Sequence, residues 1–423
     1  MGQPIKVTSL HMTRYMTRSN ADTADKGKVQ GHWRELDVLR GIAAVMMIAN
    51  HVGVKFLSPQ HTESGLTEAV LFVGSFAPVM FFFITGVGAG IQSGQKKQAS
   101  RWFSVINKVG ILVLADFLMA WSGGSWWRLD FLSFIGLCIL ILECVRNSKS
   151  PVVASAVGLG AVSLLRYLIG PIAHEFGYDQ QIWGLSFLLG TEITPGVSYP
   201  LAPWLAYPFL GYLVGVAIDR FRSRVEEQRW RAALGLLAVA IVPGIIAVYL
   251  ALKGAVFFRW GTVSLAFYII SFTALAVCVA FSLMLCSNLC PQFGPRFLSL
   301  KGISSLAIVP IHYFLIDTGF WLGLRAIQPA AYYWVMIAIL ALSFFLAARM
   351  DRIGSAVRQI SEQGLIRSCL LGLLTASALI ILVTHQTHPP TAMVAKTIGQ
   401  LALCLLFVLP SALMPLPLSR AKA

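Results

Sequence analysis

Ionisable side chains gather in and just before the first long apolar segment of the sequence, near residues 36–57. Such groups are expensive inside a membrane and are functional candidates by default. On a helix, Arg40 and His51 would lie within roughly 20° of one face and about 16 Å apart along the axis. A guanidinium binds phosphate well, and an imidazole can act as a general base or as a nucleophile. Alternatively, Arg40 is a snorkelling cap and His51 is a polar residue at the interface.

Other polar residues lie in or beside later apolar segments. Asp116 falls in the third segment, either as a carboxylate that orients an imidazole or as a protonated group that bonds between helices. His312 falls near the middle of the ninth, as a second polar group of a site or as a satisfied core histidine. Asp317 points about 140° away from His312 on an ideal helix, so the two are not expected to form a local dyad. His61 lies in the first external loop, where an ordinary loop histidine is the simpler interpretation.

The elements that carry these residues follow from composition. Of 423 residues, 57% are hydrophobic and only 12% are charged, and the mean hydropathy is +0.73. A soluble enzyme, a disulfide scaffold and a disordered protein are therefore excluded, because none could cover so much apolar surface. The seven cysteines form no CxxC pair and no Cys/His spacing typical of zinc sites. Long unbroken apolar runs predict helices and not a transmembrane β-barrel.

The fold class expected is an all-α polytopic transmembrane bundle with about 10–12 spans. The stretch 171–200 contains Gly, Pro and acidic residues, and is expected to be a long external loop with a re-entrant or interfacial helix. The spans are expected near residues 36–57, 67–92, 103–122, 130–145, 151–171, 199–218, 232–252, 260–286, 303–323, 330–349, 369–384 and 397–413.

Charge distribution predicts the orientation. The formal net charge is +15, and 26 of the 33 Lys and Arg residues lie on segments that would share one side of the membrane. The positive-inside rule then places both termini in the cytoplasm. A basic cytoplasmic tail is expected at 1–33, a single transmembrane domain at 34–414 and a second tail at 415–423. No nucleic-acid partner is implied, because the basic excess is explained by topology.

Four short motifs, in order along the chain, resemble those of transmembrane acyl-CoA acyltransferases. They are LDVLRGIAA at 36–44 followed by Asn50-His51, PVMFFFITG at 78–86, PW at 203–204 with GYLVG at 211–215, and GISSLAIVPIH at 302–312. The Arg40-to-His51 spacing is similar to the signature of the acyltransferase-three family. The second and fourth motifs are similar to segments found both there and in the heparan-α-glucosaminide N-acetyltransferase family, and the third is similar to a helix of the latter.

The resemblance implies transfer of an acyl group, above all acetyl, from cytoplasmic acyl-CoA to a hydroxyl or amine of an extracytoplasmic glycan or glycolipid. His51 would be the general base or acyl carrier, Asn50 an oxyanion donor, and Asp116 and His312 further catalytic residues. The glucosaminide family also places a histidine before a Gly-Leu-Thr stretch, which corresponds here to His61. Either histidine is therefore a candidate. No metal is implied.

The donor site would lie at the cytoplasmic end of the first helix. Acyl-CoA carries several phosphate charges, and the resemblance implies that Arg40 binds them, with Asp37, Lys96, Lys97 and Arg101 close by. Expected partners are acyl-CoA, the acceptor and membrane lipids, with a homo-oligomer as an open option. The expected location is a bacterial inner membrane. Alternatives are a transporter of a small solute or glycolipid, and a non-catalytic membrane subunit of a glycan-assembly machine.

Overall fold

The computed structural model describes residues 33–62, 65–93, 101–120, 129–182, 184–191, 197–257, 263–287, 298–300, 304–357, 363–384 and 387–408. By its contacts the chain divides into Met1–Arg34 and Glu35–Ala423, and the second unit is described below. Its regular elements in the described ranges are helices, with two isolated β-bridges that join Leu57 to Ile327 and Leu129 to Val197. The two predicted tails lie almost wholly outside these ranges.

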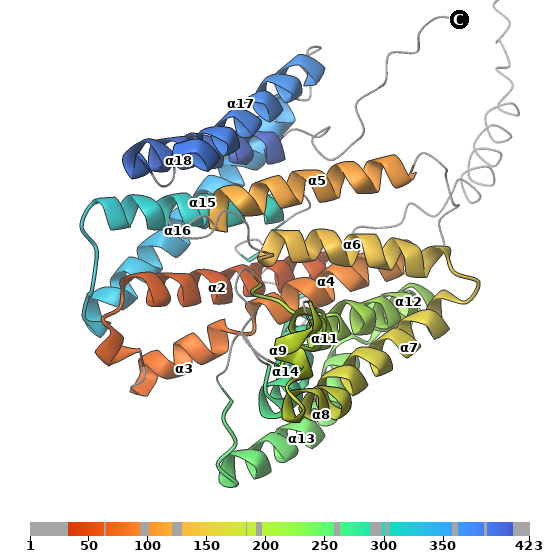
Figure 1. The fold of residues 1–423 in the computed structure, drawn as a ribbon. Coiled ribbons are helices and arrows are strands. Elements are labelled where there is room, and N and C mark those ends of the chain that lie inside the picture. The colour runs from red at the N-terminus through yellow and green to blue at the C-terminus, as the bar shows by residue number, and fades with distance from the viewer. Residues whose placement is uncertain are drawn as a thin grey trace, which may run out of the picture. The chain divides into compact units, whose positions relative to one another are not determined.

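The helices follow the order of colours in Figure 1. The N-terminal half contains α2 (Arg34–Phe56), η1 (Pro59–His61), α3 (Gly65–Gly74), α4 (Ala77–Ile91), α5 (Arg101–Ala120), α6 (Phe131–Asn147), α7 (Pro151–Leu164), the π-helical turn η2 (Leu165–Ile169), α8 (Gly170–Glu175), α9 (Tyr178–Gln181), α10 (Leu185–Leu189) and α11 (Leu201–Trp204). The remainder contains α12 (Ala206–Glu227), α13 (Arg229–Leu252), α14 (Leu265–Leu285), α15 (Ser304–Trp321), α16 (Pro329–Val357), α17 (Gln363–Thr384) and α18 (Pro389–Val408).

In the described ranges, helices lie within all twelve segments predicted to span the membrane, so the predicted fold class is confirmed. Within the described ranges, 10 helical stretches are long and apolar enough to cross a bilayer. The other two predicted spans are α6, which has 17 residues, and α15, which has 18 and contains His312 and Asp317. Polar side chains lower the hydropathy of α15, but a helix still satisfies its backbone within the segment.

Two segments differ in detail from the predicted spans. The second span is broken into α3 and α4 at Ser75 and Phe76, where Pro78 stands in the first turn of α4 and cannot donate a backbone hydrogen bond. The stretch after α7 that was predicted to be an external loop holds three short helices, α8, α9 and α10, in place of one helix. Left-handed φ angles occur at Gly177 and Gly184, which separate these helices, and at Gly190, which ends α10.

Small residues allow α4 and α12 to pack backbone to backbone. Gly86 and Gly90 are one turn apart on α4, and Gly211 and Gly215 are one turn apart on α12. A Cβ added to Gly86 would lie 2.1 Å from the carbonyl oxygen of Pro208, and one added to Gly211 would lie 2.1 Å from that of Phe83. This is the small-xxx-small arrangement of membrane helix pairs, here present on both helices.

We expect Gly86→Ala to destabilise the protein by about 1–3 kcal/mol, because the methyl group forces two packed backbones apart. The matched control is Gly88→Ala on the same helix, since no atom lies within 4 Å of the added Cβ. Thermal unfolding of the purified protein in detergent measures both. Equal melting temperatures for the two variants would show that the close contact between α4 and α12 does not exist.

Beside this helix pair lies a buried aromatic cluster. Phe82 of α4 contacts Phe134 of α6, with ring centroids 4.6 Å apart, and contacts Tyr199 and Trp204 edge-on. All four side chains are buried. Since Tyr199 also lines the cavity described next, this cluster connects the core of the bundle to the candidate site.

Candidate active site

Helices α2 and α15 bring two histidines together. His51 Nδ1 lies 2.9 Å from His312 Nε2, although the residues are 261 positions apart in the chain. The rings stack with centroids 5.2 Å apart and planes 14° apart, and the ring of Tyr313 contacts both. His312 is fully buried and His51 is half-buried. The pair therefore has a wall of protein on the His312 side.

The hydrogen bonds of this pair determine where the protons lie. His312 Nδ1 is 2.9 Å from the carbonyl oxygen of Ile308. A carbonyl oxygen only accepts, so Nδ1 of His312 carries a hydrogen and donates it. In the neutral ring, Nε2 of His312 then bears the lone pair and accepts from Nδ1–H of His51. The same logic leaves the lone pair of neutral His51 on Nε2, which is the nitrogen that can accept a further proton.

A small cavity of about 30 Å³ adjoins His51. That volume has room for about one water molecule. Its walls come from α2, the α3–α4 break, the start of α6, the α10–α11 connection and α15. The lining residues are Met47, Asn50, His51, Gly74, Ala77, Pro78, Asp130, Phe131, Tyr199 and Tyr313.

Asn50 connects α2 to the neighbouring helix. Its Nδ2 donates to the carbonyl oxygen of Leu71 in α3 at 3.0 Å, and the side chain is buried. Gly74 allows this approach, because a Cβ there would lie 2.8 Å from the Cβ of Asn50. An amide nitrogen has two hydrogens, so one N–H of Asn50 remains for a group in the cavity.

Asp116, on α5, contacts the first turn of α6. Its carboxylate accepts from the backbone N–H groups of Asp130, Leu132 and Ser133 at 3.0–3.2 Å. These donors have no partner within the helix, and the positive end of the helix dipole favours an anion there. Asp116 thus positions the first turn of α6, which presents Asp130 and Phe131 to the cavity.

We expect Asp116→Ala to lower the free energy of unfolding by about 1–3 kcal/mol, because three backbone donors lose their acceptor. Asp116→Asn keeps an acceptor oxygen and should lose less. Melting temperatures in detergent distinguish the two variants. If alanine and asparagine are equally mild, the carboxylate does not cap α6.

Asp317 of α15 binds two side chains of α18. Its Oδ2 lies 2.9 Å from Lys396 Nζ and 3.0 Å from Gln400 Nε2. As the helical spacing predicted, Asp317 does not pair with His312. Instead the ion pair connects α15, which carries His312, to α18.

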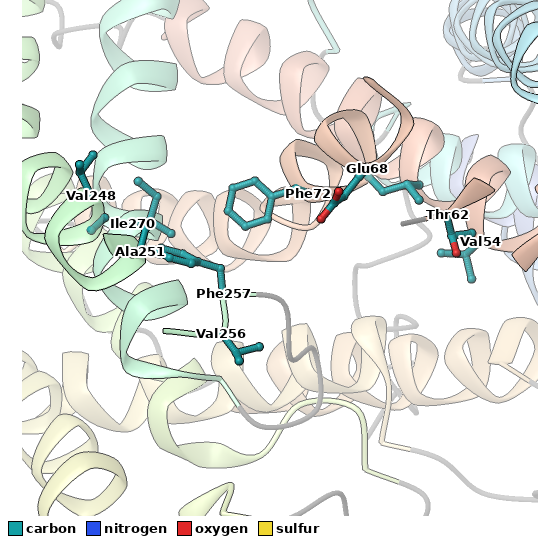
Figure 2. A pocket seen from close by; sticks show the side chains of 11 residues that line it. Val54, Thr62, Glu68, Phe72, Val248, Ala251, Val256, Phe257 and Ile270 are labelled. Carbon is teal, nitrogen blue, oxygen red and sulfur yellow. The ribbon is translucent and has the colours of Figure 1, made fainter. Parts of the chain in front are cut away.

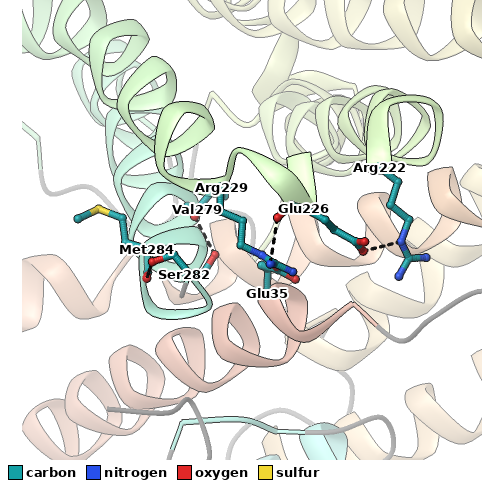
Figure 3. A network of polar contacts seen from close by, with 8 residues as sticks. Glu35, Arg222, Glu226, Arg229, Val279, Ser282 and Met284 are labelled. Atoms are coloured by element: carbon teal, nitrogen blue, oxygen red, sulfur yellow. Dashed lines mark hydrogen bonds and ion pairs between the residues drawn. The ribbon is translucent and has the colours of Figure 1, made fainter. Parts of the chain in front are cut away.

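At the N-terminal end of α2, Arg40 pairs with Asp37 at 2.7 Å, and the Arg40 side chain is 22% exposed. Figure 3 shows Glu35 of the same helix bound to Arg229, which also donates to the backbone of Glu226. A polar cavity of about 460 Å³ lies beside Arg229 and includes Arg231, Glu226 and Glu227 in its lining. Its two arginines are balanced by two glutamates, so this cavity carries little net charge.

Three of the predicted donor-site residues have no described side chain. Lys96 and Lys97 lie outside the described residues. Arg101 begins α5, but only its backbone is described. Of the predicted donor set, Arg40 and Asp37 are therefore the residues whose side chains can be placed, and they lie about 16 Å and about 21 Å along α2 from His51.

His61 lies in η1, outside the His51 cavity. Its backbone N–H donates to Ser58, and its neighbour Thr62 borders a separate groove of about 910 Å³. Figure 2 shows side chains that line this groove, among them Glu68, Phe72 and Phe257. Its lining is mostly apolar. His51 therefore lines the small cavity and His61 does not.

A family model described as Heparan-alpha-glucosaminide N-acetyltransferase, catalytic, matches residues 33–271, which is more than half of the chain. The chain belongs to this family. Comparison with curated proteins and with solved structures gave no match. The predicted resemblance is confirmed, and it extends from α2 into α14.

The range matched by the N-acetyltransferase family model contains some of the candidate site residues but not all of them. The matched range includes Arg40, Asn50, His51, His61 and Asp116. His312 lies beyond it, on α15. The hydrogen bond between His51 and His312 thus joins the matched part of this family member to a helix that the match does not reach.

The sequence analysis missed two groups of residues, of which the first lines the cavity and the second is a separate polar cluster. Asp130, Tyr199 and Tyr313 line the cavity, and only Asp130 had a local signal, as a polar residue directly before the apolar run that became α6. The second group is a polar cluster around α8 and α9, in which Asp179 accepts a hydrogen bond from Thr191 and contacts His174. Burial raises the pKa of the Asp179 carboxyl, but hydrogen bonds from Thr191 and His174 outweigh it and hold that pKa below its ordinary value.

Proposed function

We propose that the protein transfers an acetyl group from acetyl-CoA, on the cytoplasmic side, to a hydroxyl or amine of a glycan or glycoconjugate on the other side. Family membership supports acetyl transfer in general. The observation that supports the assignment of the site is the His51–His312 pair, which leaves a lone pair on His51 Nε2 beside a small cavity.

In the proposed step, His51 is the general base. The oxygen or nitrogen of the acceptor attacks the thioester carbonyl carbon while its proton passes to Nε2 of His51. The C–S bond then breaks, the sulfur of CoA leaves with the electron pair, and His51 returns the proton to it. The products are acylated acceptor and free CoA. A ping-pong route, in which Nε2 attacks the thioester first, would use the same lone pair.

Two groups in the cavity support this step. The remaining N–H of Asn50 can donate to the carbonyl oxygen as negative charge develops on it. Asp130 shares the cavity with His51, and its carboxylate would stabilise the imidazolium that forms. Asp116, through the first turn of α6, would be a positioning residue for Asp130.

The donor is proposed to bind with its phosphates at Arg40 and its arm along α2. A reach of about 16 Å suits an extended pantetheine chain. Because Arg40 is paired with Asp37, a phosphate would have to share or displace that carboxylate. Lys96, Lys97 and Arg101 remain proposed contributors. A cavity of about 30 Å³ does not hold an acetyl thioester, so the proposal requires Phe131 or Tyr313 to move.

Orientation is part of the proposal. With both termini in the cytoplasm, Arg40 faces the compartment where acyl-CoA is made, and His51 lies in the outer half of the membrane. The apolar helices support an integral membrane protein. A bacterial inner membrane would match this arrangement.

Binding of CoA to the purified protein tests the donor assignment. We expect acetyl-CoA or CoA to raise the melting temperature, since a ligand at 100 times its Kd adds about 2.7 kcal/mol of stability. Arg40→Ala should weaken this effect. Stabilisation by a small solute and none by CoA would support a transporter instead.

A further inference from the structure

A buried arginine at the start of α17 has no acidic partner among the side chains that the structure describes. Arg367 is 1% exposed and lies in the second turn of the helix. Its Nη2 donates to Asn107 Oδ1 of α5 at 3.3 Å, and its Nε is buried without a hydrogen-bond partner. Among the described side chains, no carboxylate lies within ion-pair distance of the guanidinium.

A charge buried in this way calls for an anion. Buried charges in proteins are ordinarily paired, because removing a lone ion from water is unfavourable. The surroundings favour an anion further, since Arg367 and Asn107 lie near the N-terminal ends of α17 and α5, where helix dipoles are positive. The hydrogen bond between Arg367 and Asn107 brings these N-terminal parts of the two helices beside each other.

We propose that Arg367, with Asn107, binds a phosphate group. The planar guanidinium is suited to a phosphate, which it can hold through two parallel hydrogen bonds. With the orientation proposed above, the site lies at the cytoplasmic end of the bundle. Either the headgroup of an inner-leaflet phospholipid or a free phosphate anion could supply that group.

The site is separate from the His51 cavity. Asn107 and Asp116 are both on α5, nine residues and therefore about 14 Å apart along the helix. Asp116 lies toward the C-terminal end of α5 and contacts the first turn of α6, which borders the cavity. Arg367 itself lies outside the range that matches the acetyltransferase family.

The test is thermal stabilisation of the full chain, purified in a non-ionic detergent. Short-chain phosphatidylglycerol and inorganic phosphate are the probes, and dioctanoylglycerol controls for the lipid tails. At least one phosphate-bearing probe should raise the melting temperature, and Arg367→Gln should weaken its apparent Kd by at least tenfold. Arg349→Gln removes an exposed arginine near the end of α16 and should leave the Kd unchanged.

The outcomes separate the two sources and can overturn the proposal. Stabilisation by phosphatidylglycerol alone assigns the site to a lipid headgroup, and stabilisation by both probes assigns it to phosphate in general. The proposal fails if neither probe stabilises the protein, or if Arg367→Gln binds as the unsubstituted protein does. Should the glutamine variant not fold, Arg367→Lys replaces it, because a lysine lacks the planar fork; an unchanged Kd there also overturns the assignment.

Discussion

Replacing His51 with alanine should leave a folded protein in which acetyl transfer is slower by about 10²–10⁴-fold, the range that a general base contributes. D-Glucosamine is a suitable acceptor probe, because it offers both an amine and hydroxyls. Release of the CoA thiol measures the rate. Hydroxylamine treatment of the product distinguishes an ester, which it cleaves, from an amide.

Two controls make this result specific to the base. His61→Ala should keep the rate within a few-fold, because His61 lies outside the cavity that His51 adjoins. Stabilisation by CoA should survive in His51→Ala, since Arg40 is about 16 Å away along α2. Full activity in His51→Ala together with loss in His61→Ala would transfer the catalytic role to His61.

The helices were predictable because the bilayer allows few alternatives. Within hydrocarbon a backbone must satisfy its own hydrogen bonds, so a run of about 20 apolar residues becomes a helix whatever its neighbours are. The break between α3 and α4 was not predicted, because hydropathy is continuous across Ser75 and Phe76. Its cause is partly tertiary: Gly74 ends α3 against Asn50 of another helix.

The members of the site were easier to predict than their arrangement. His51 and His312 were both recognised as polar residues in apolar surroundings, but nothing local to either one specifies a partner 261 residues away. For Asp116, the sequence predicted the environment of the side chain but not its contacts. Its burial was predicted, yet its role depends on where the first turn of α6 packs, and periodicity along α5 carries no information about that. Packing between helices decided both cases.

Substitution of His312 should lower the rate according to whether the new side chain can accept a hydrogen bond. His312→Leu leaves Nδ1–H of His51 without its acceptor, so the lone pair is no longer held on Nε2. We expect kcat to fall by about 10²–10³-fold, within the range of up to about 10⁴ attributed to fixing a catalytic tautomer in hydrolytic triads. His312→Gln provides an oxygen at a similar reach and should recover much of the loss.

A structural role for His312 would give a different pattern. Loss of packing would lower the melting temperature in proportion to the loss of activity, and glutamine would be no better than leucine at a fully buried position. The hydrogen-bonding role predicts that KM for acetyl-CoA stays nearly constant while kcat falls, because His312 does not contact the donor in the proposed mechanism.

The double variant tests whether His312 affects the reaction through His51. If His312 acts only through His51, then adding His312→Leu to His51→Ala should change the residual rate by less than about twofold, because residues that act as one unit are strongly non-additive. If His312 has an independent catalytic role, the two losses should multiply. A multiplicative result would show that the 2.9 Å contact between the rings is not the route by which His312 affects the reaction.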